Sequence, residues 1–268
     1  MTTKTTADDV RTGVRKSYTE VVNKAAEGGG CCGGSTGCCA VPVSASAGAS
    51  AQMGYSDEEL ASLPSGANLG LGCGNPQAIA ALKPGEVVVD LGSGAGIDCF
   101  LASQRVGAKG KVIGVDMTPD MITSARRHAR DNYFENVEFR LGEIESLPIA
   151  DGVADVIMSN CVINLSPEKE RVFREAYRIL KPGGRLAISD VVATGHIPDS
   201  VRNDPKMISG CIAGAAPVAE IERMLRDAGF TRIAVDVNGE SREFIKDWAP
   251  GSKIEDYVSS ASIQAVKG

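Results

Sequence analysis

The sequence predicts an α/β fold in which a mostly parallel sheet of seven strands is covered by helices on both faces. From Glu86 onward, short runs rich in β-branched residues alternate with amphipathic segments, which is the pattern of alternating strands and helices. A glycine-rich turn directly follows the first run, and parallel sheets of this kind bind ligands at the carboxyl ends of their strands. We expect strands at 87–91, 111–116, 137–141, 153–160, 185–192, 231–237 and 259–266.

Helices are expected between these strands, because each connecting segment carries a helix-start signal or an apolar helical stripe. They are expected at 97–106, 118–132, 166–180 and 217–229. Residues 193–216 and 241–251 break the alternation. We expect the first of these to be an inserted segment that lies over the edge of the sheet.

The part of the chain before the first strand differs in composition from the rest. Apolar residues at helical spacing predict an amphipathic helix over 8–26. The stretch GGGCCGGSTGCCAVP (28–42) follows, and the Ser/Ala/Gly-rich VSASAGASAQMG (43–54) is expected to be a flexible linker. Further on, Ser56 with Glu59 predicts a capping box, and Asn75 before Pro76 predicts another helix start. The predicted organisation is an extension over 1–72, a core over 73–192 and a completing segment over 193–268.

Charge and hydropathy exclude two classes of partner at this stage. The formal net charge of the 268 residues is −6 and no Lys/Arg cluster is present, so we expect no nucleic acid partner. No apolar stretch approaches the ~18–20 residues of a membrane span, and the N-terminus lacks the apolar core of a secretory signal. We therefore expect a cytoplasmic protein that does not enter membranes. Stable disulfides are uncommon there, so the eight cysteines are expected to bind metal, to be redox-active or to be buried.

The stretch DLGSGAGID suggests a cofactor site. Glycines let the backbone turn tightly and let a ligand approach closely. The dinucleotide fingerprint needs glycine where Ile97 stands, and no Lys-Ser/Thr of a phosphate-binding loop follows. Asp116, 20 residues after Gly96, ends the second strand and can accept hydrogen bonds from two ribose hydroxyls. The alternatives are a simple tight turn for the glycines and a helix-capping role for Asp116.

These residues resemble the class I S-adenosylmethionine-dependent methyltransferases over about 85–192, and the resemblance implies their Rossmann-like fold. It also implies that Asp90 and the glycine loop hold the methionine part of the cofactor, Asp116 the ribose, and Glu143 with Ile144 the adenine. The cofactor-binding residues expected on this basis are Asp90, Gly92, Ser93, Gly94, Gly96, Asp116, Met117, Glu143, Ile144 and Asn160.

Three cysteines outside 28–42 have placements that favour a role at a substrate site, because Cys161 stands at the strand end where a methyl acceptor is bound in this fold. Cys161 follows Asn160 at the end of the fourth strand, Cys211 lies in the inserted segment, and Cys73 lies in the glycine-rich GLGCGNP. Taken singly, each would more often be a small buried hydrophobe. Cys99, one turn into the first helix, is expected to be structural.

The strings LGCGNP, DLGSGAGIDCF, SNCVINL and SGCIAGA together resemble the arsenite methyltransferases. That resemblance implies that Cys73, Cys161 and Cys211 bind trivalent arsenic. A fourth family cysteine lies in the N-terminal extension, where this chain offers Cys31, Cys32, Cys38 and Cys39. It further implies arsenite as substrate, S-adenosylmethionine as methyl donor, a thiol reductant (thioredoxin or glutathione) as co-substrate, and methylated arsenicals as products for detoxification.

The chemistry agrees with this resemblance. Soft thiolates prefer soft centres, and trivalent arsenic on three sulfurs keeps a lone pair that can attack a methyl group without a general base. The orientation of that lone pair is then the main task. Disulfide formation among the cysteines would reduce the arsenic again. The two histidines need no role: His128 is expected on a solvated helix face and His196 on the surface of the insertion.

Two other hypotheses remain open from the residues. A methyltransferase of the same fold could act on a quinone or another small molecule, with incidental cysteines. A non-catalytic metalloid- or zinc-binding protein could keep the fold for ligand binding alone, although the adjacent C-C pairs suit zinc poorly.

Overall fold

The computed structural model describes residues 6–27, 43–249 and 251–268, and it confirms the predicted α/β architecture. One sheet has the strand order β3-β2-β1-β4-β5-β8-β7, and the two-residue β6 pairs with β5 beside this path. The strands are β1 (Val87–Leu91), β2 (Lys111–Asp116), β3 (Val137–Leu141), β4 (Ala154–Asn160), β5 (Leu180–Ala193), β6 (Ala216–Pro217), β7 (Phe230–Asn238) and β8 (Val258–Lys267).

The strand directions determine where a ligand can bind. Strands β1 to β5 run parallel, and β8 lies antiparallel between β5 and β7. The first three strands are added in one direction across the sheet, from β1 to β3, and the next strand, β4, pairs with β1 on its other side. The carboxyl ends of β1 and β4 therefore form the crevice at which open α/β sheets bind ligands.

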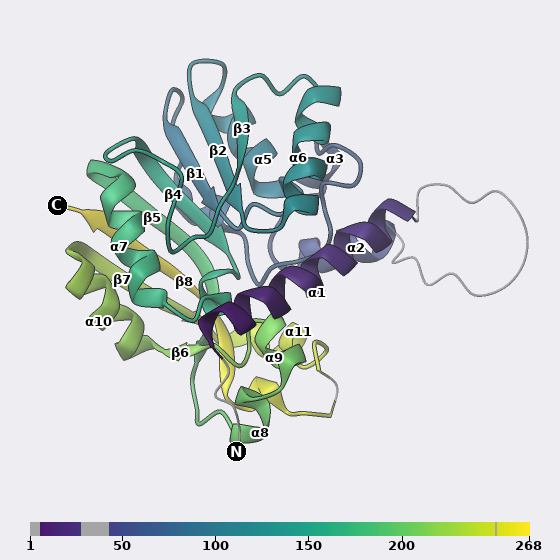
Figure 1. The fold of residues 1–268 in the computed structure, drawn as a ribbon, viewed down its shortest axis with the longest axis vertical. Helices are drawn as coiled ribbons and strands as arrows, with labels where there is room; N and C mark the ends of the chain where they lie inside the picture. Colours follow the sequence, from purple (N-terminus) through teal and green to yellow (C-terminus); the bar gives the residue numbers. More distant parts are fainter. Residues whose placement is uncertain (1–5, 28–42, 250) are drawn as a thin grey trace, which may run out of the picture.

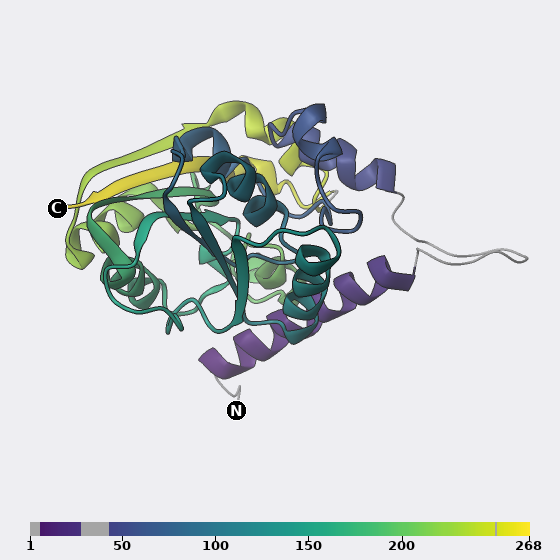
Figure 2. The ribbon, with the colours of Figure 1, turned by 90° about the horizontal axis from the view of Figure 1, so that it is seen from above.

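Helices cover both faces of the sheet, as Figures 1 and 2 show. Apolar residues of α7 and α10 pack with the sheet in one core, and those of α5 and α6 pack in the other. The helices are α1 (Ala7–Glu27), α2 (Val43–Gln52), α3 (Asp57–Ala61), α4 (Pro76–Ala80), α5 (Ile97–Val106), α6 (Pro119–Asp131), α7 (Lys169–Ile179), α8 (Asp199–Arg202), α9 (Pro205–Ser209), α10 (Val218–Ala228) and α11 (Arg242–Ile245), with short 3₁₀ turns η1 (Ile163–Leu165), η2 (Gly239–Ser241) and η3 (Ile254–Asp256).

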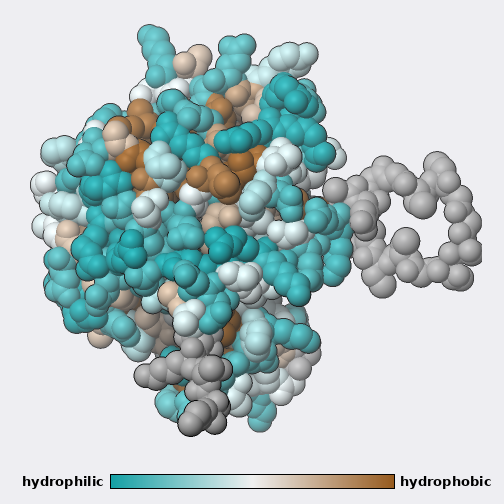
Figure 3. Space-filling view, viewed as in Figure 1, coloured by the Kyte–Doolittle hydropathy of each residue, from teal (hydrophilic) through white to brown (hydrophobic). Residues whose placement is uncertain are grey.

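The predicted N-terminal helix is confirmed as α1, which lies across the carboxyl side of the sheet. It packs on α6, η1 and α9, so it joins the first half of the fold to the inserted segment (Figures 1 and 2). Its outer face is mostly hydrophilic, whereas apolar patches gather on the same side of the molecule over the strands above it (Figure 3). Helix α1 therefore covers the carboxyl ends of the parallel strands.

The prediction of a flexible linker over 43–54 is wrong, because 43–52 form α2. Alanine has the highest helix propensity, and the segment holds several. Tertiary contact adds to this, since buried Ser50 donates a hydrogen bond to Asn68 at 2.9 Å. Composition typical of linkers can thus form a helix where one end is anchored.

Other local predictions are confirmed or corrected by the structure. The capping box of Ser56 with Glu59 is formed, and the side chain of Asn75 caps α4. Helix α7 begins later than expected, at Lys169. Strand β5 begins at 180 rather than 185, so the Lys-Pro-Gly-Gly run lies inside it. Among the described residues, no helix is both long and apolar enough to span a bilayer.

The expectation for His128 is wrong, whereas that for His196 is confirmed. His128 is only 7% exposed, and its Nδ1 lies 3.3 Å from the carbonyl oxygen of Ala95. Burial lowers the pKa of this imidazole. His196 is exposed. The helix period alone did not show that the segment around Gly66 covers His128.

Candidate active site

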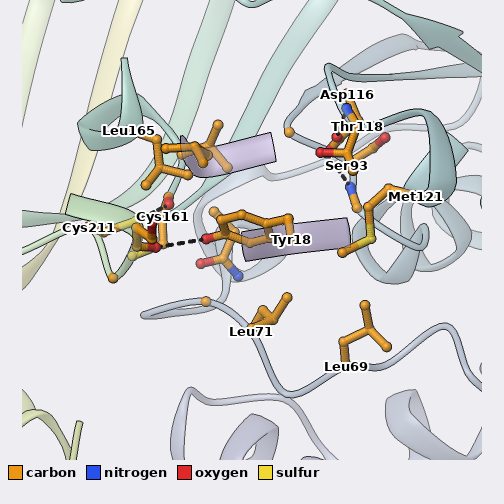
Figure 4. Close-up of a pocket in the computed structure, with 18 of the residues that line it drawn as sticks. Tyr18, Leu69, Leu71, Ser93, Asp116, Thr118, Met121, Cys161, Leu165 and Cys211 are labelled. Carbon is orange, nitrogen blue, oxygen red and sulfur yellow. Dashed lines mark hydrogen bonds between the residues drawn. The ribbon is translucent and has the colours of Figure 1, made fainter. Parts of the chain in front are cut away.

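A cavity of about 640 Å³ opens at the carboxyl ends of β1, β2 and β4, beneath α1. The glycine loop and α6 form one end of it, and the segment after α9 forms the other. In Figure 4, Asp116, Ser93, Thr118 and Met121 lie at one end, Cys161 and Cys211 at the other, and Tyr18 of α1 between them. A single cavity therefore joins the two sites that were predicted separately.

The glycine loop between β1 and α5 has the backbone that its sequence predicts. Gly92 and Gly96 have φ values of +72° and +104°, which side chains other than glycine rarely adopt. A Cβ at Gly92 would lie 2.3 Å from a Val162 methyl carbon. Gly94 also has a positive φ, but a Cβ there would meet nothing within 4 Å, because Gly94 lines the cavity. Gly92 and Gly96 are thus needed for the packing of the loop, and Gly94 leaves space open in the cavity.

Asp116 ends β2 and ties the two loops together. Its carboxylate accepts hydrogen bonds from the backbone N–H of Gly94 at 3.0 Å and of Thr118 at 2.8 Å. Met117 and Thr118 follow it in the cavity wall. The hydroxyl of Ser93, buried in the same wall, has no hydrogen-bond partner among the described residues. A polar ligand would satisfy that hydroxyl, since buried polar groups are rarely left unpaired.

Three buried carboxyl groups line this end of the cavity: Asp90, Asp98 and Asp116. Burial raises the pKa of all three, that of Asp98 to about 6, and the neighbouring Asp98 raises that of Asp90 further. No lysine or arginine of the described residues forms an ion pair with them. A ligand that carries positive charge fits such a site, and S-adenosylmethionine brings a sulfonium and an ammonium group.

The expected adenine residues divide in the structure. Ile144 lines the cavity, whereas Glu143 does not; its carboxylate pairs with Arg11 and Arg15 of α1 at 3.5 and 3.3 Å. Glu145 lines the cavity instead and is held by Arg11 at 3.2 Å. Arg11 also pairs with Glu168. This network, in which Arg11 and Glu145 are buried and the other members are partly exposed, fastens α1 to the segments after β3 and η1.

The structure brings the three predicted cysteines together. The Sγ atoms of Cys73 and Cys161 and a carboxylate oxygen of Asp190 all lie within 4.8 Å of one another. The thiol of Cys211 donates to the carbonyl oxygen of Cys161. Residues separated by up to 138 positions in the chain thus form one thiol cluster, which we define as Cys73, Cys161 and Cys211. All three belong to one buried apolar core.

The backbone at two of these cysteines is unusual. Cys161 and Cys211 have φ values of +58° and +64°, in the left-handed region that costs a non-glycine residue about 1–2 kcal/mol. Such strain persists only where the surrounding structure holds it, and it gathers at functional sites. Both residues line the cavity, which is the result of these turns.

Burial and neighbouring groups keep the cluster protonated at neutral pH. Burial raises the pKa of Cys73 to about 11. The pKa values of Cys161 and Cys211 are raised well above their ordinary value, with hydrogen bonds inside the cluster, burial and the negative charge of Asp190 as causes. These thiols are therefore not freely reactive thiolates.

The remaining cysteines divide into two groups. Cys99 is a buried residue of α5 that packs in the core and donates to Asp90 at 3.3 Å, so it stands apart from the thiol cluster, as expected for a structural residue. Cys31, Cys32, Cys38 and Cys39 fall outside the described residues.

Sequence reasoning missed several residues of this site. Tyr18 carried a signal as the aromatic residue of an amphipathic helix, and burial raises its pKa well above the usual value. Asp190 is a carboxylate within an apolar strand and only 1% exposed, with Asn164 donating to it at 2.9 Å. Phe244 and Trp248 line the thiol end from the segment 241–251, whose sequence shows no motif.

Comparison with known proteins identifies close relatives. A family model described as a methyltransferase domain matches residues 82–229. An arsenite methyltransferase of Halobacterium salinarum is 51% identical over 267 residues, which cover 97% of this chain and 67% of that protein. One from Aquipseudomonas alcaligenes is 49% identical over 167 residues, covering 60% of this chain and 48% of that protein. The chain thus spans two thirds of the first relative, and its match to the second covers about half of that protein.

A solved structure shows the same likeness. The crystal structure of an arsenic(III) S-adenosylmethionine methyltransferase from Chlamydomonas reinhardtii matches with a TM-score of 0.62 and 35% sequence identity. The match covers 83% of this chain and 73% of that one.

Proposed function

The chain belongs to the arsenite methyltransferase family, and from that premise we propose that it transfers a methyl group from S-adenosylmethionine to trivalent arsenic held by its thiol cluster. The observation that carries the proposal is that Cys161 and Cys211 line a cavity whose other end is lined by carboxylates, with the Sγ of Cys73 within 4.8 Å of the Sγ of Cys161. An incidental set of cysteines would have no reason to meet at a methyl-acceptor site.

Substrate capture follows from the protonation state of the thiols. Arsenite is As(OH)₃ at neutral pH, and each thiol exchanges with one hydroxyl, so that an As–S bond forms, an As–OH bond breaks and one water leaves. Three such exchanges give As(S–Cys)₃ without net release of protons. Since the thiols are protonated, each supplies the proton that its leaving hydroxyl needs. Soft sulfur is the preferred partner of arsenic.

The cofactor end complements this. When bound, S-adenosylmethionine supplies a methyl group on a sulfonium, an electrophile that the arsenic lone pair can attack. Asp116 would hold the ribose, Ile144 the adenine, and the Asp90 and Asp98 carboxylates the positive groups. Tyr18 and α1 exclude water from the space between the two ends (Figure 4). Orientation then supplies much of the rate, since no proton leaves the nucleophile.

Methyl transfer oxidises arsenic from the trivalent to the pentavalent state, and we propose that the cluster reverses this. Two sulfurs leave arsenic as a disulfide, and the electron pair that they release returns to arsenic. An external thiol, either thioredoxin or glutathione, then reopens the disulfide by exchange. We also propose that Cys31, Cys32, Cys38 or Cys39 contributes a fourth thiol, and that the reaction takes place in the cytoplasm.

Arsenic speciation tests the proposal. Purified protein is incubated with arsenite, S-adenosylmethionine and a thiol reductant, and the arsenic species are separated by chromatography. We expect methylated arsenic from the unchanged chain and from Cys99→Ser, and none from Cys161→Ser or Cys211→Ser. Absence of methylated arsenic from the unchanged chain would refute the proposed function, and full activity of either cluster variant would refute the role of the thiols.

A further inference from the structure

The backbone of Cys73 is held on both sides by side chains from distant strands. Its N–H donates to the Asn160 side-chain oxygen at 3.0 Å, and its C=O accepts from the Ser260 hydroxyl at 2.7 Å. Asn160 ends β4 and Ser260 lies in β8, whereas Cys73 itself lies in no helix or strand. The hydroxyl oxygen of Ser241 in turn accepts a hydrogen bond from the backbone N–H of Ser260 at 2.9 Å.

The amide of Asn160 has no N–H group left for a ligand. Its nitrogen donates to the Gly74 carbonyl at 2.8 Å and to the Tyr55 hydroxyl at 3.0 Å, while its oxygen accepts from Cys73. The partners fix this orientation, because a backbone N–H needs an acceptor and a carbonyl needs a donor. Tyr55 donates onward to Asp98 at 2.9 Å. The resemblance placed Asn160 among cofactor-binding residues, but its hydrogen bonds point to the Cys73 loop.

The glycines around Cys73 fit the same interpretation. Gly72 has a φ of +132°, and a Cβ there would lie 2.8 Å from the Asn160 amide. A Cβ at Gly74 would lie 3.0 Å from the Ser189 hydroxyl. The sequence G-C-G therefore lets the loop approach β4 and β5 closely. This approach allows the hydrogen bonds from the Asn160 and Ser260 side chains to the Cys73 backbone, which we call the clamp.

We propose that Asn160 and Ser260 are positioning residues that hold Cys73 in register with Cys161, and so set the affinity of the thiol cluster for trivalent arsenic. Cys161 comes directly after Asn160. The end of β4 therefore presents the Cys161 thiol and, through Asn160, holds the backbone of Cys73. Without the clamp, the Cys73 loop has to be ordered when arsenic binds, and that entropy cost weakens binding. This inference rests on the proposed function.

The test separates arsenic affinity from cofactor affinity. The full chain is titrated with arsenite by calorimetry, and Cys161→Ser gives the background from other thiols. Fluorescence of Trp248, the single tryptophan of the chain, which lines the cavity beside the cluster, is followed on the same samples. S-adenosylmethionine is titrated in a separate experiment. Ser262→Ala is the matched control, because Ser262 lies two residues along the same strand with no side-chain hydrogen bond to Cys73.

We expect Ser260→Ala, which loses one hydrogen bond, to weaken arsenite binding about 5-fold, and Asn160→Ala to weaken it ~10- to 100-fold. Ser262→Ala should stay within about 2-fold of the unchanged chain. The affinity of Ser260→Ala for S-adenosylmethionine should also stay within about 2-fold, and the KM for arsenite should rise alone.

Three outcomes decide between the claims. Unchanged arsenite affinity in both variants overturns the clamp, and so does an equal loss of arsenite and cofactor affinity, which would indicate a general structural role. If Asn160→Ala does not fold, Ser260→Ala decides alone. Lack of arsenite binding above background in the unchanged chain would instead refute the proposed function.

Discussion

The glycine loop yields the sharpest prediction about stability and binding, because two neighbouring glycines have different surroundings. Gly96 is the N-cap of α5 with φ +104°, and a Cβ there would lie 2.6 Å from a Phe100 ring carbon and 2.9 Å from one of Phe139. Gly94 has φ +52°, near the left-handed helical value, and a Cβ would meet nothing within 4 Å. Alanine at Gly96 should therefore reduce the stability of the protein, whereas alanine at Gly94 should reduce its affinity for the cofactor.

The magnitudes follow from these contacts. At Gly96, alanine incurs about 1–2 kcal/mol for the left-handed backbone and about 1–3 kcal/mol for overpacking against two rings. Restriction of the unfolded chain returns about 0.4–1 kcal/mol, which leaves a net loss of about 1–4.5 kcal/mol. At Gly94 only the backbone cost remains, so the free energy of unfolding should fall by no more than about 1.5 kcal/mol. Its methyl group, however, projects into the cofactor end of the cavity.

Urea unfolding followed by circular dichroism measures the first effect, and calorimetric titration with S-adenosylmethionine measures the second. We expect Gly96→Ala to be the less stable variant by at least about 1 kcal/mol. Gly94→Ala should be nearly as stable as the unchanged chain but bind the cofactor at least about tenfold more weakly, about 1.4 kcal/mol. Equal stability of the two variants, or unchanged cofactor affinity in Gly94→Ala, would refute this account of the loop.

Three further predictions concern the cover, the ribose acid and the buried thiol. Arg11→Met leaves the buried Glu145 carboxylate without its cation, so the free energy of unfolding should fall by about 3 kcal/mol and proteolysis of α1 should be accelerated. Arg11→Lys should have a stability between those of Arg11→Met and the unchanged chain. An unchanged cleavage rate in Arg11→Met would contradict the role of Arg11 in fastening α1. Asp116→Ala removes the acceptor of two loop N–H groups and should weaken cofactor binding at least about tenfold by calorimetry; no loss would remove Asp116 from the site. Burial raises the pKa of Cys73 from 9.0 to about 11, so the unfolded thiol ionises first and stability falls as pH rises from 9 to 11. Urea unfolding at several pH values should show Cys73→Ala losing about 2 kcal/mol less stability than the unchanged chain over that range, and parallel curves would contradict the burial of this thiol.

Local patterns carried most of the fold. The runs at β1, β2 and β4 are largely buried on both faces, so they are mostly apolar and stand out in the sequence. The glycine loop and the cap of Asn75 depend on a few adjacent residues, and both form as expected. What depends on contact between distant segments was not readable: the burial of His128 comes from the segment around Gly66, and the helix over 43–52 is anchored through Asn68.

The site shows the same division. Motifs named Cys73, Cys161 and Cys211, but not that Asp190 would join them, because one carboxylate in an apolar strand has no local signal. The position of Asn160 at a strand end favoured a cofactor role, and only the three-dimensional course of the loop before α4 showed its hydrogen bonds to Cys73.

X-ray absorption of arsenic bound to the protein tests the central claim most directly. The sample is the full chain with Cys31, Cys32, Cys38 and Cys39 replaced by serine, loaded with one equivalent of arsenite, so that only the described cysteines can bind it. If the thiol cluster of Cys73, Cys161 and Cys211 is the arsenic site, the spectrum will show three sulfur neighbours and no oxygen. Arsenic that keeps its oxygen neighbours, or that binds with three sulfurs even in Cys161→Ser, would contradict the account.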